Sequence, residues 1–294
     1  MQIIRQNEHA PGVRPSVVLG YFDGLHCAHL ELFRLAAQSG AQIAALTFSG
    51  EKSPFITSES EKLALLEKAG VDIVYLYDFN DVKGIAYDAF FRDEIVSRIG
   101  ASSLFCGFNY TFGKDARGGA AELTALADAA GIKTTVAPEI QIDGVCVSST
   151  NIRDLLAAGD INKAALFLGR SFSITGKVIH GQGLGRKLGF PTINIKYGDG
   201  RAPIPRGVYF TTCVIGGGAH PAVTSVGTRP TVEGHTLLCE SYLLDINQNL
   251  YGEEVEVAFL DFKRSEKKFE NISELTSAVE ADISAAKEYF DIKI

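Results

Sequence analysis

Three features that would assign this chain to an extracellular or membrane class are missing: paired cysteines, an N-terminal apolar core and long apolar runs. The five cysteines stand singly, without a C-x-x-C pair, which is typical of free thiols in a reducing cytosol. Residues 1–16 lack the apolar core of a signal peptide, and no run of about 18 apolar residues occurs. We therefore expect a cytoplasmic protein without a membrane partner.

An excess of positive charge is also absent. The sequence has 28 basic and 35 acidic side chains, and its net charge is −7. Broad binding to nucleic acid requires a basic face, so we expect no nucleic-acid partner. Small phosphorylated ligands remain possible, because they need only local positive charge. The sequence contains no internal repeat, and it does not indicate an oligomeric state.

What is present in the first half is an alternation of apolar, strand-like runs with helical patterns. At 294 residues two domains are expected, because single cores usually stop growing near ~250 residues. The expected strands cover residues 17–19, 41–48, 71–77, 103–106 and 133–137, and the expected helices cover residues 58–70, 86–99 and 120–131. This alternation predicts βαβ units and a parallel sheet, that is, a Rossmann-like α/β domain.

The stretch VVLGYFDGLHCAH, residues 17–29, predicts an anion site in this domain. An apolar strand ends at Gly20, the chain turns, and a helix follows that carries His26 and His29. The first amides of a helix have no intrahelical acceptor and the helix dipole is positive there, so phosphate is a natural ligand. Two histidines three residues apart share one helix face. The alternatives are exposed polar residues at a helix start or, with less support, a zinc site.

Two further loops are expected beside this stretch, because ligands of parallel sheets gather at the carboxyl ends of strands. Residues 107–113, GFNYTFG, directly follow an expected strand and contain Asn109. Residues 148–153, SSTNIR, place hydroxyl groups before a helix and Arg153 on its first turn. Hydroxyl groups, helix amides and a guanidinium group suit a polyphosphate. Taken singly, the hydroxyl residues could form a plain N-cap, and Asn109 could be a turn residue.

The pattern changes after a short, helix-like connector at residues 159–170. Six short segments then alternate β-branched and polar residues, with Gly and Pro between them and no intervening helices. They cover residues 174–179, 192–195, 207–215, 222–226, 237–245 and 254–260, and an amphipathic helix is expected over 273–290. This pattern predicts a six-stranded antiparallel β-barrel with a terminal helix.

A glycine-rich segment, HGQGLGRKLGFPTINI, is the candidate ligand loop of the second half. Gly181, Gly183 and Gly185 allow backbone amides to approach a phosphate group, and Arg186 and Lys187 follow directly. Between residues 176 and 206 there are six basic residues and one acidic residue, which is a local excess in an acidic protein. The segment matches neither a Walker A sequence nor G-x-G-x-x-G. The alternative is a solvated, glycine-rich hairpin.

Three motifs of the first half resemble the adenylyltransferase module of the bifunctional riboflavin kinase/FMN adenylyltransferase family, the prokaryotic FAD synthetases of the nucleotidyltransferase superfamily. They are G-x-F-D-x-x-H-x-x-H, G-F-N-Y-x-F-G and S-S-T-x-I-R. The resemblance implies catalytic roles for His26, His29, Asn109 and Arg153. It implies cofactor-binding roles for Gly20, Phe22, Asp23, Ser149 and Thr150. The chain departs from the family at Ala28, because a Gly is usual between the two histidines.

In the second half, P-T-x-N at residues 191–194 resembles the signature of the riboflavin kinase module. Thr192 and Asn194 project on one face of a strand, so a hydroxyl and an amide oxygen can together hold an Mg²⁺ ion. By resemblance they bridge this metal to the phosphates of ATP. The family's general base is a Glu in a downstream strand, and the matching residue is Glu240. Without the resemblance, Glu240 would be taken for a surface residue.

The resemblance spans about residues 17–290, with both modules in family order. It implies an FMN adenylyltransferase domain over residues 1–158, a connector over 159–170 and a riboflavin kinase domain over 171–294. The implied reactions are the Mg²⁺-dependent phosphorylation of riboflavin by ATP to FMN, and the adenylylation of FMN by ATP to FAD with release of pyrophosphate. The alternatives are a chain with one live activity, a flavin-binding protein without turnover, and a nucleotidyltransferase with another phosphorylated acceptor.

Overall fold

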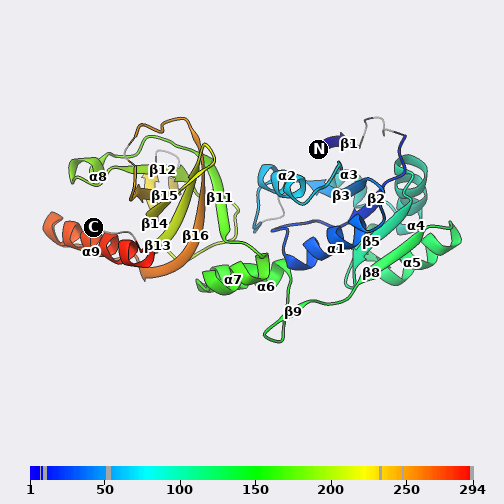
Figure 1. The fold of residues 1–294 in the computed structure, drawn as a ribbon. Coiled ribbons are helices and arrows are strands. Elements are labelled where there is room, and N and C mark those ends of the chain that lie inside the picture. Colours follow the sequence, from blue (N-terminus) through cyan, green and yellow to red (C-terminus); the bar gives the residue numbers. More distant parts are fainter. Residues whose placement is uncertain (7, 9–11, 51–53, 232–233, 247, 292–294) are drawn as a thin grey trace. The chain divides into compact units, whose positions relative to one another are not determined.

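The computed structural model describes residues 1–6, 8, 12–50, 54–231, 234–246 and 248–291. They form two compact units, Met1–Asn151 and Ile152–Ile294, each with its own six-stranded sheet (Figure 1). The predicted combination of an α/β unit and an antiparallel β unit is confirmed. The five cysteines form no disulfide. None of the helices within these ranges has the length and apolar character needed to cross a bilayer.

The first unit is built on a parallel sheet. Its strands are β1 (Gln2–Arg5), β2 (Ser16–Leu19), β3 (Ile43–Ser49), β4 (Ile73–Asp78), β5 (Ser103–Gly107) and β8 (Lys133–Ala137). Their order in the sheet is β1-β4-β3-β2-β5-β8. The central strands are continuous apolar runs because both faces of the sheet are covered. The sequence pattern did not predict β1, an edge strand of four residues in which only Ile4 is buried.

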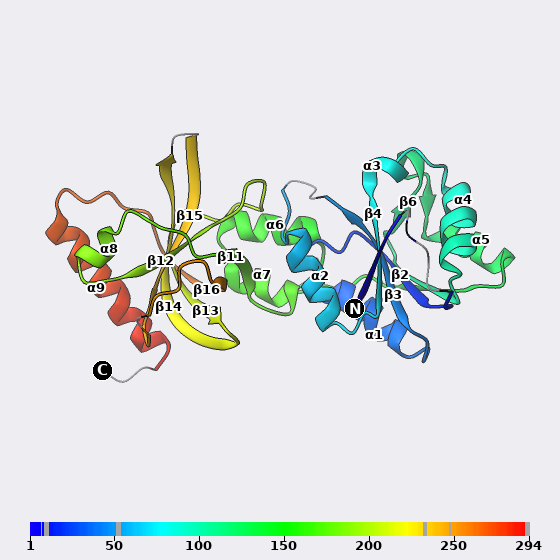
Figure 2. The ribbon, with the colours of Figure 1, turned by 90° about the horizontal axis from the view of Figure 1, so that it is seen from above.

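Helices cover both faces of this sheet (Figure 2). On one face, α1 (Cys27–Ala37) and α2 (Glu59–Lys68) bury Leu32, Phe33 and Leu66 in a core cluster. The other face is covered by α3 (Phe79–Val82), α4 (Tyr87–Phe90), the π-helix η1 (Phe91–Ile99) and α5 (Ala120–Ala129). The single helix predicted over residues 86–99 is thus a short α-helix that continues with π-helical geometry.

The strand order places an opening at the carboxyl ends of β2 and β5. The chain passes from β2 to β3 and β4 on one side, and then returns to β5 and β8 on the other side. In sheets of this type, ligands bind where the strand order reverses. Short elements follow β5 and β8, namely β6 (Thr111–Phe112), η2 (Lys114–Ala116), β7 (Gly118–Gly119), β9 (Gln141–Ile142) and β10 (Val145–Cys146).

The second unit contains a curved antiparallel sheet that forms a half-barrel (Figure 1). Its strands are β11 (Phe172–Lys177), β12 (Thr192–Lys196), β13 (Gly207–Ile215), β14 (Gly218–Thr231), β15 (Gly234–Leu243) and β16 (Glu254–Ser265). Their order is β11-β16-β13-β14-β15-β12, and Ile179 N donates a hydrogen bond to Asn194 O at 2.8 Å beyond the end of β11. β14 and β16 are longer than predicted, because their polar ends continue to pair with neighbouring strands.

The helices that the structure describes from residue 149 onward are α6 (Ser149–Ala158), α7 (Ile161–Leu168), α8 (Leu184–Lys187) and α9 (Ile272–Tyr289). The two compact units divide between Asn151 and Ile152, inside α6. α7 lies in the predicted connector and packs on β11 and β16. The glycine-rich segment contains α8, which the sequence pattern did not predict. α9 lies where the terminal helix was expected, and Arg264 Nη2 on β16 binds Asp282 Oδ2 of this helix at 2.6 Å.

Candidate functional site

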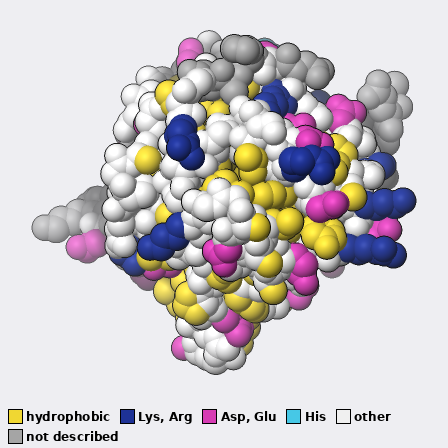
Figure 3. Space-filling view, turned by 90° about the vertical axis from the view of Figure 1, so that its right-hand side faces the viewer, with side chains coloured by type: hydrophobic (Ala, Val, Ile, Leu, Met, Phe, Trp, Pro, Cys, Tyr) yellow, Lys and Arg dark blue, Asp and Glu magenta, His cyan; other side chains and the backbone are white. Residues whose placement is uncertain are grey.

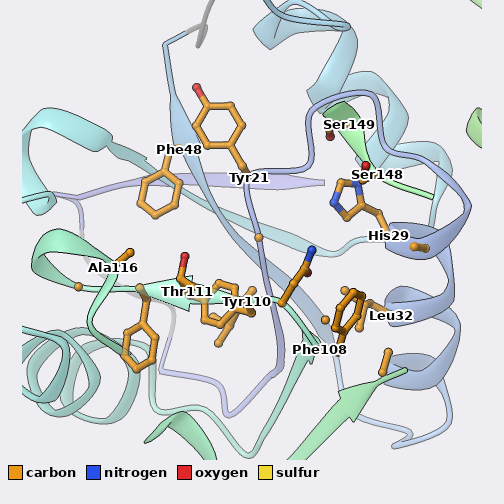
Figure 4. A pocket seen from close by; sticks show the side chains of 18 of the residues that line it. Tyr21, His29, Leu32, Phe48, Phe108, Tyr110, Thr111, Ala116, Ser148 and Ser149 are labelled. Atoms are coloured by element: carbon orange, nitrogen blue, oxygen red, sulfur yellow. The ribbon is translucent and has the colours of Figure 1, made fainter. Parts of the chain in front are cut away.

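A cavity of about 900 Å³ opens at the carboxyl ends of the strands in the first unit (Figure 4). The residues that line it lie at or after the ends of β2, β3, β4, β5 and β8, on α1, and at the start of α6. Figure 4 shows His29, Ser148 and Ser149 on one side of the cavity, and Tyr21 and Phe48 on the other. The cavity therefore offers a ligand one polar region and one aromatic region.

His26 and His29 are stacked at the start of α1, with ring centroids 3.6 Å apart. The helix begins at Cys27, so His26 is its N-cap, and its Nδ1 accepts a hydrogen bond from His29 N at 3.4 Å. The prediction that the helix itself carries both residues is wrong for His26, because this side chain replaces an intrahelical acceptor. Both histidines and Ala28 line the cavity. The N-terminus of α1 and two imidazole rings thus border the same space.

His29 is a neutral histidine with a free ring nitrogen. Its pKa lies well below the ordinary value, first because burial penalises the charged ring and second because His26 is adjacent. Its Nδ1 is buried and makes no hydrogen bond with any residue that the structure describes. A buried ring nitrogen without a partner, on the wall of a cavity, is available to a ligand. His29 therefore offers a hydrogen bond to a ligand, and not a fixed charge.

The lowered pKa of His29 predicts that the free energy of unfolding falls as the pH drops below about 6.5. Below that pH the unfolded chain binds a proton at His29, whereas the folded chain does not. The stability is fully present above this pH and declines below it, by at most about 1.4 kcal/mol per pH unit for this residue. Urea unfolding of the wild type and His29→Gln from about pH 7.5 to about pH 5.5 measures the effect. Equal pH slopes for the two proteins would contradict it.

Three more of the predicted polar residues, Asn109, Ser149 and Thr150, line the same cavity. Ser149 Oγ donates a hydrogen bond to Asp23 O at 2.8 Å, which joins the start of α6 to the turn after β2. Residues from the first, middle and last motifs of this unit thus meet at one site. Arg153 lies one turn further along α6, beyond the division between the units, and does not line the cavity.

Two of the predicted cofactor-binding side chains, those of Phe22 and Asp23, lie behind the cavity wall. Phe22 is fully buried with a left-handed backbone (φ 58°), and its ring packs edge-on against His29 at 5.2 Å. The Asp23 carboxylate accepts hydrogen bonds from the amides of residues 56–57 at 2.8 and 3.1 Å. Gly20 lines the cavity, and a Cβ at this position would lie 2.6 Å from the Phe22 ring. Phe22 and Asp23 thus shape the turn that precedes the histidine pair.

The aromatic residues of the cavity were not among the predicted site residues. Phe48 lies near the end of β3, Phe79 directly follows β4, and Phe108 directly follows β5. Phe79 and Phe108 are 49% and 46% exposed, which is high for large apolar side chains. The rings of Tyr21 and Phe48 stack with centroids 6.1 Å apart. Their signal in the sequence was their position at the ends of apolar strands, where ligands of such sheets bind.

In the second unit, the glycine-rich segment and the P-T-x-N motif border one small pocket. Its lining includes Gly181, Gly183, Gly185, Arg186, Thr192, Asn194, Glu240 and Tyr251. β12 and β15 pair so that Asn194 lies directly opposite Glu240. Residues directly opposite in an antiparallel pair project on the same face of the sheet, so these side chains are neighbours. Lys187, on α8, is exposed and does not line this pocket.

The oxygen-bearing side chains of this pocket suit a magnesium ion. Asn194 is only 5% exposed, and it lines the pocket together with Thr192 and Glu240. A Cβ at Gly181 would lie 2.6 Å from the Asn194 amide nitrogen, and one at Gly185 would collide with Phe190 O and lie 3.4 Å from Thr192 Oγ1. The two glycines therefore keep space beside the amide and hydroxyl groups that an oxygen-preferring cation uses.

A zinc site at the histidine pair would need a third metal-binding side chain nearby. In the part of the chain that the structure describes, no group of three or more His, Cys, Asp or Glu side chains is arranged to hold a metal ion. Zinc sites in proteins usually have at least three such ligands.

Comparison with known proteins assigns a different family to each half of the chain. Residues 11–151 match the family described as FAD synthetase, and residues 168–290 match the family described as riboflavin kinase. A bifunctional riboflavin kinase/FMN adenylyltransferase of Haemophilus influenzae is 32% identical, over 99% of this chain and 100% of its own length. A protein of the same description from Pseudomonas fluorescens is 34% identical, over 92% of this chain and 91% of its own length.

Among solved structures, a Streptococcus pneumoniae protein described as a macrolide-efflux protein has 30% sequence identity and a TM-score of 0.87. The likeness covers 98% of this chain and 99% of that chain. The likeness shows that the two proteins share a fold. The description as an efflux protein applies to the Streptococcus pneumoniae protein and is not transferred to this chain. Matches to both family descriptions, together with relatives above 30% identity over nearly the whole chain, agree with the motifs and their placement. The chain belongs to the bifunctional riboflavin kinase/FMN adenylyltransferase family.

Proposed function

We propose that the second unit transfers the γ-phosphoryl group of ATP to riboflavin, and that the first unit transfers the adenylyl group of another ATP to the resulting FMN. The observation that supports this proposal is that polar and glycine residues of the predicted phosphate motifs line a separate pocket in each unit. Each set comes from motifs that are far apart in the sequence.

In the first unit, a phosphate oxygen of FMN attacks the α-phosphorus of ATP, and the bond to pyrophosphate breaks as the new P–O bond forms. This step needs no protein nucleophile, so the residues act by holding the reacting groups and stabilising charge. The N-terminus of α1, with His26 and His29, favours the negative charge of the triphosphate. Asn109 and the hydroxyl groups of Ser149 and Thr150 add hydrogen bonds from the same wall. Arg153 is the proposed further cation.

In the second unit, the terminal hydroxyl of the ribityl chain attacks the γ-phosphorus of ATP, and ADP leaves. Glu240 accepts the proton of this hydroxyl group. Thr192 and Asn194 would hold Mg²⁺, which supplies positive charge to the phosphates when bound. The glycine-rich segment brings backbone amides close to the phosphates, and Arg186 adds positive charge beside them.

The extent of the two domains and the kind of partner are part of the same proposal. The adenylyltransferase domain covers residues 1–158 and the kinase domain residues 171–294, with α7 in the connector.

The proposed partners of the protein are small molecules. On the face shown in Figure 3, Lys and Arg side chains are interspersed with Asp and Glu side chains, which does not favour a polyanion. The unpaired cysteines support a location in the cytoplasm.

The test is an assay of the purified chain with riboflavin, ATP and Mg²⁺, in which the flavins are separated by chromatography. We expect FMN to form first with release of ADP, and FAD to follow with release of pyrophosphate. Chelation of Mg²⁺ should stop the formation of FMN. FMN that accumulates without FAD, or FAD that forms only when FMN is supplied, would reduce the proposal to one live activity. Flavin binding without ADP release would indicate a flavin-binding protein.

A further inference from the structure

Lys62 is a buried lysine beside the aromatic region of the first cavity. Only 3% of its surface is exposed, whereas Lys68 on the same helix, α2, is exposed. Lysine is rarely buried, because removing an ammonium group from water is unfavourable unless its charge is compensated. The buried ammonium group of Lys62 therefore needs neighbouring groups that compensate its charge.

The ammonium group of Lys62 contacts two residues of the cavity wall. Its Nζ donates a hydrogen bond to Phe48 O at 2.7 Å, and it lies 4.9 Å from the centre of the Tyr21 ring. Phe48 belongs to β3 and Tyr21 follows β2, so one cation joins the ends of two neighbouring strands. Phe48 and Tyr21 line the cavity, where Figure 4 shows their rings on the side away from His29. Lys62 itself does not line it.

Two hydrogen bonds hold the two ends of Tyr21. Its hydroxyl group donates a hydrogen bond to Gly50 O at 2.7 Å, and Thr47 Oγ1 donates one to Tyr21 O at 2.9 Å. The attraction between the Lys62 ammonium group and the face of the ring adds a constraint on the ring itself. Loss of this cation would remove this constraint on the ring and the hydrogen bond to Phe48 O together.

We propose that Lys62 is a positioning residue for the adenylylation reaction, because it holds the Tyr21 and Phe48 wall against which a planar ring of a substrate packs. The inference rests on the proposed function of the first unit. FMN and ATP both carry a planar ring, and packing on an aromatic side chain depends on the position and tilt of its ring. Lys62 touches no substrate and no reacting phosphate group. Its loss should therefore weaken the binding of a ring and leave the chemical step intact.

The test compares Lys62→Met, Lys62→Arg and Lys68→Met. Methionine keeps the apolar part of the side chain and removes the charge, whereas arginine keeps a cation that can donate a hydrogen bond and stack on a ring. Lys68→Met is the same change at the exposed lysine of the helix. The kcat and the KM for FMN and for ATP are measured for FAD formation. Riboflavin phosphorylation and the melting temperature are measured on the same preparations.

We expect Lys62→Met to raise the KM for FMN or ATP about tenfold and to change kcat less than about twofold. Lys62→Arg should recover part of the loss, and Lys68→Met should behave like the wild type. In a Tyr21→Leu background, Lys62→Met should have a smaller effect on KM than in the wild type, because one of the two wall contacts of Lys62 is already gone.

Two results would overturn the inference. One is an unchanged KM for both substrates in Lys62→Met. The other is a parallel loss of both reactions with a lower melting temperature, which would make Lys62 a residue of the fold alone. A wild-type chain that forms no FAD from FMN and ATP would instead contradict the proposed function of the first unit.

Discussion

His26→Ala should lower the rate of FAD formation from FMN and ATP by at least about 100-fold, while riboflavin phosphorylation continues. His26 lines the cavity of the first unit at the N-terminus of α1, and its ring is stacked on that of His29. Its removal takes away one polar group on the side of the cavity proposed to bind phosphate, and the ring that is stacked on His29. The pocket of the glycine-rich segment lies in the other unit and keeps all of its residues. The two reactions are measured separately, from FMN and from riboflavin.

The matched control for this prediction is His26→Ser. His26 is the N-cap of α1, and loss of a cap costs about 0.5–2 kcal/mol of stability. The alanine variant therefore loses both the helix cap and the imidazole ring. Serine is a good N-cap but has no imidazole ring. We expect His26→Ser to have the stability of the wild type and to form FAD as slowly as His26→Ala does. Normal FAD formation in His26→Ser would reduce His26 to a cap. Equal loss of both reactions in a folded His26→Ala protein would contradict the two-site proposal.

Asn194→Ala should lower riboflavin phosphorylation by about 100-fold or more and leave the conversion of FMN to FAD intact. Asn194 is buried, lies opposite Glu240 across the β12–β15 pair, and is the proposed amide ligand of Mg²⁺. Loss of one ligand weakens the binding of the ion, so a higher Mg²⁺ concentration should restore part of the activity. The measurement is the rate of FMN formation over a series of Mg²⁺ concentrations.

Two further variants separate the roles in this pocket. Asn162→Ala makes the same change at an exposed asparagine of the second unit, whose side chain binds Asp261 at 3.1 Å, and it should keep full activity. Glu240→Gln should abolish phosphorylation without a change in Mg²⁺ dependence, because it removes the proposed base and keeps the shape of the side chain. Normal phosphorylation in Asn194→Ala would refute the proposed ligand. Loss of FMN conversion in that variant would show that the two pockets do not act separately.

The elements that were predicted correctly are those whose signal is local. β2, β3 and β4 are continuous apolar runs, and the helices between the strands have caps or apolar stripes, so alternation alone indicates a parallel sheet. β1 was missed because an edge strand of four residues carries almost no pattern. The π-helical geometry of η1 and the short helix α8 were missed because neither has a distinct periodicity in the sequence.

For the candidate site, too, some features were predicted from the sequence and others were not. His26, His29, Asn109, Ser149 and Thr150 were assigned from motifs, and the structure brings them to one cavity, although their roles there remain predictions. The positions of Phe22 and Asp23 behind the wall, and of Arg153 and Lys187 outside the pocket linings, could not be foreseen. A motif tells which residues follow a strand, but it does not tell which way each side chain turns.

The sequence by itself determined the two modules and their order, and it indicated which residues to expect at a phosphate site, because these depend on local periodicity and on motifs of fixed spacing. Only the tertiary structure decided that the two histidines stack at a helix N-terminus, that Asn194 lies opposite Glu240, and that the ammonium group of Lys62 lies beneath Tyr21. The physical reason is that strand order, register and side-chain direction arise from pairing and packing between segments far apart in the chain.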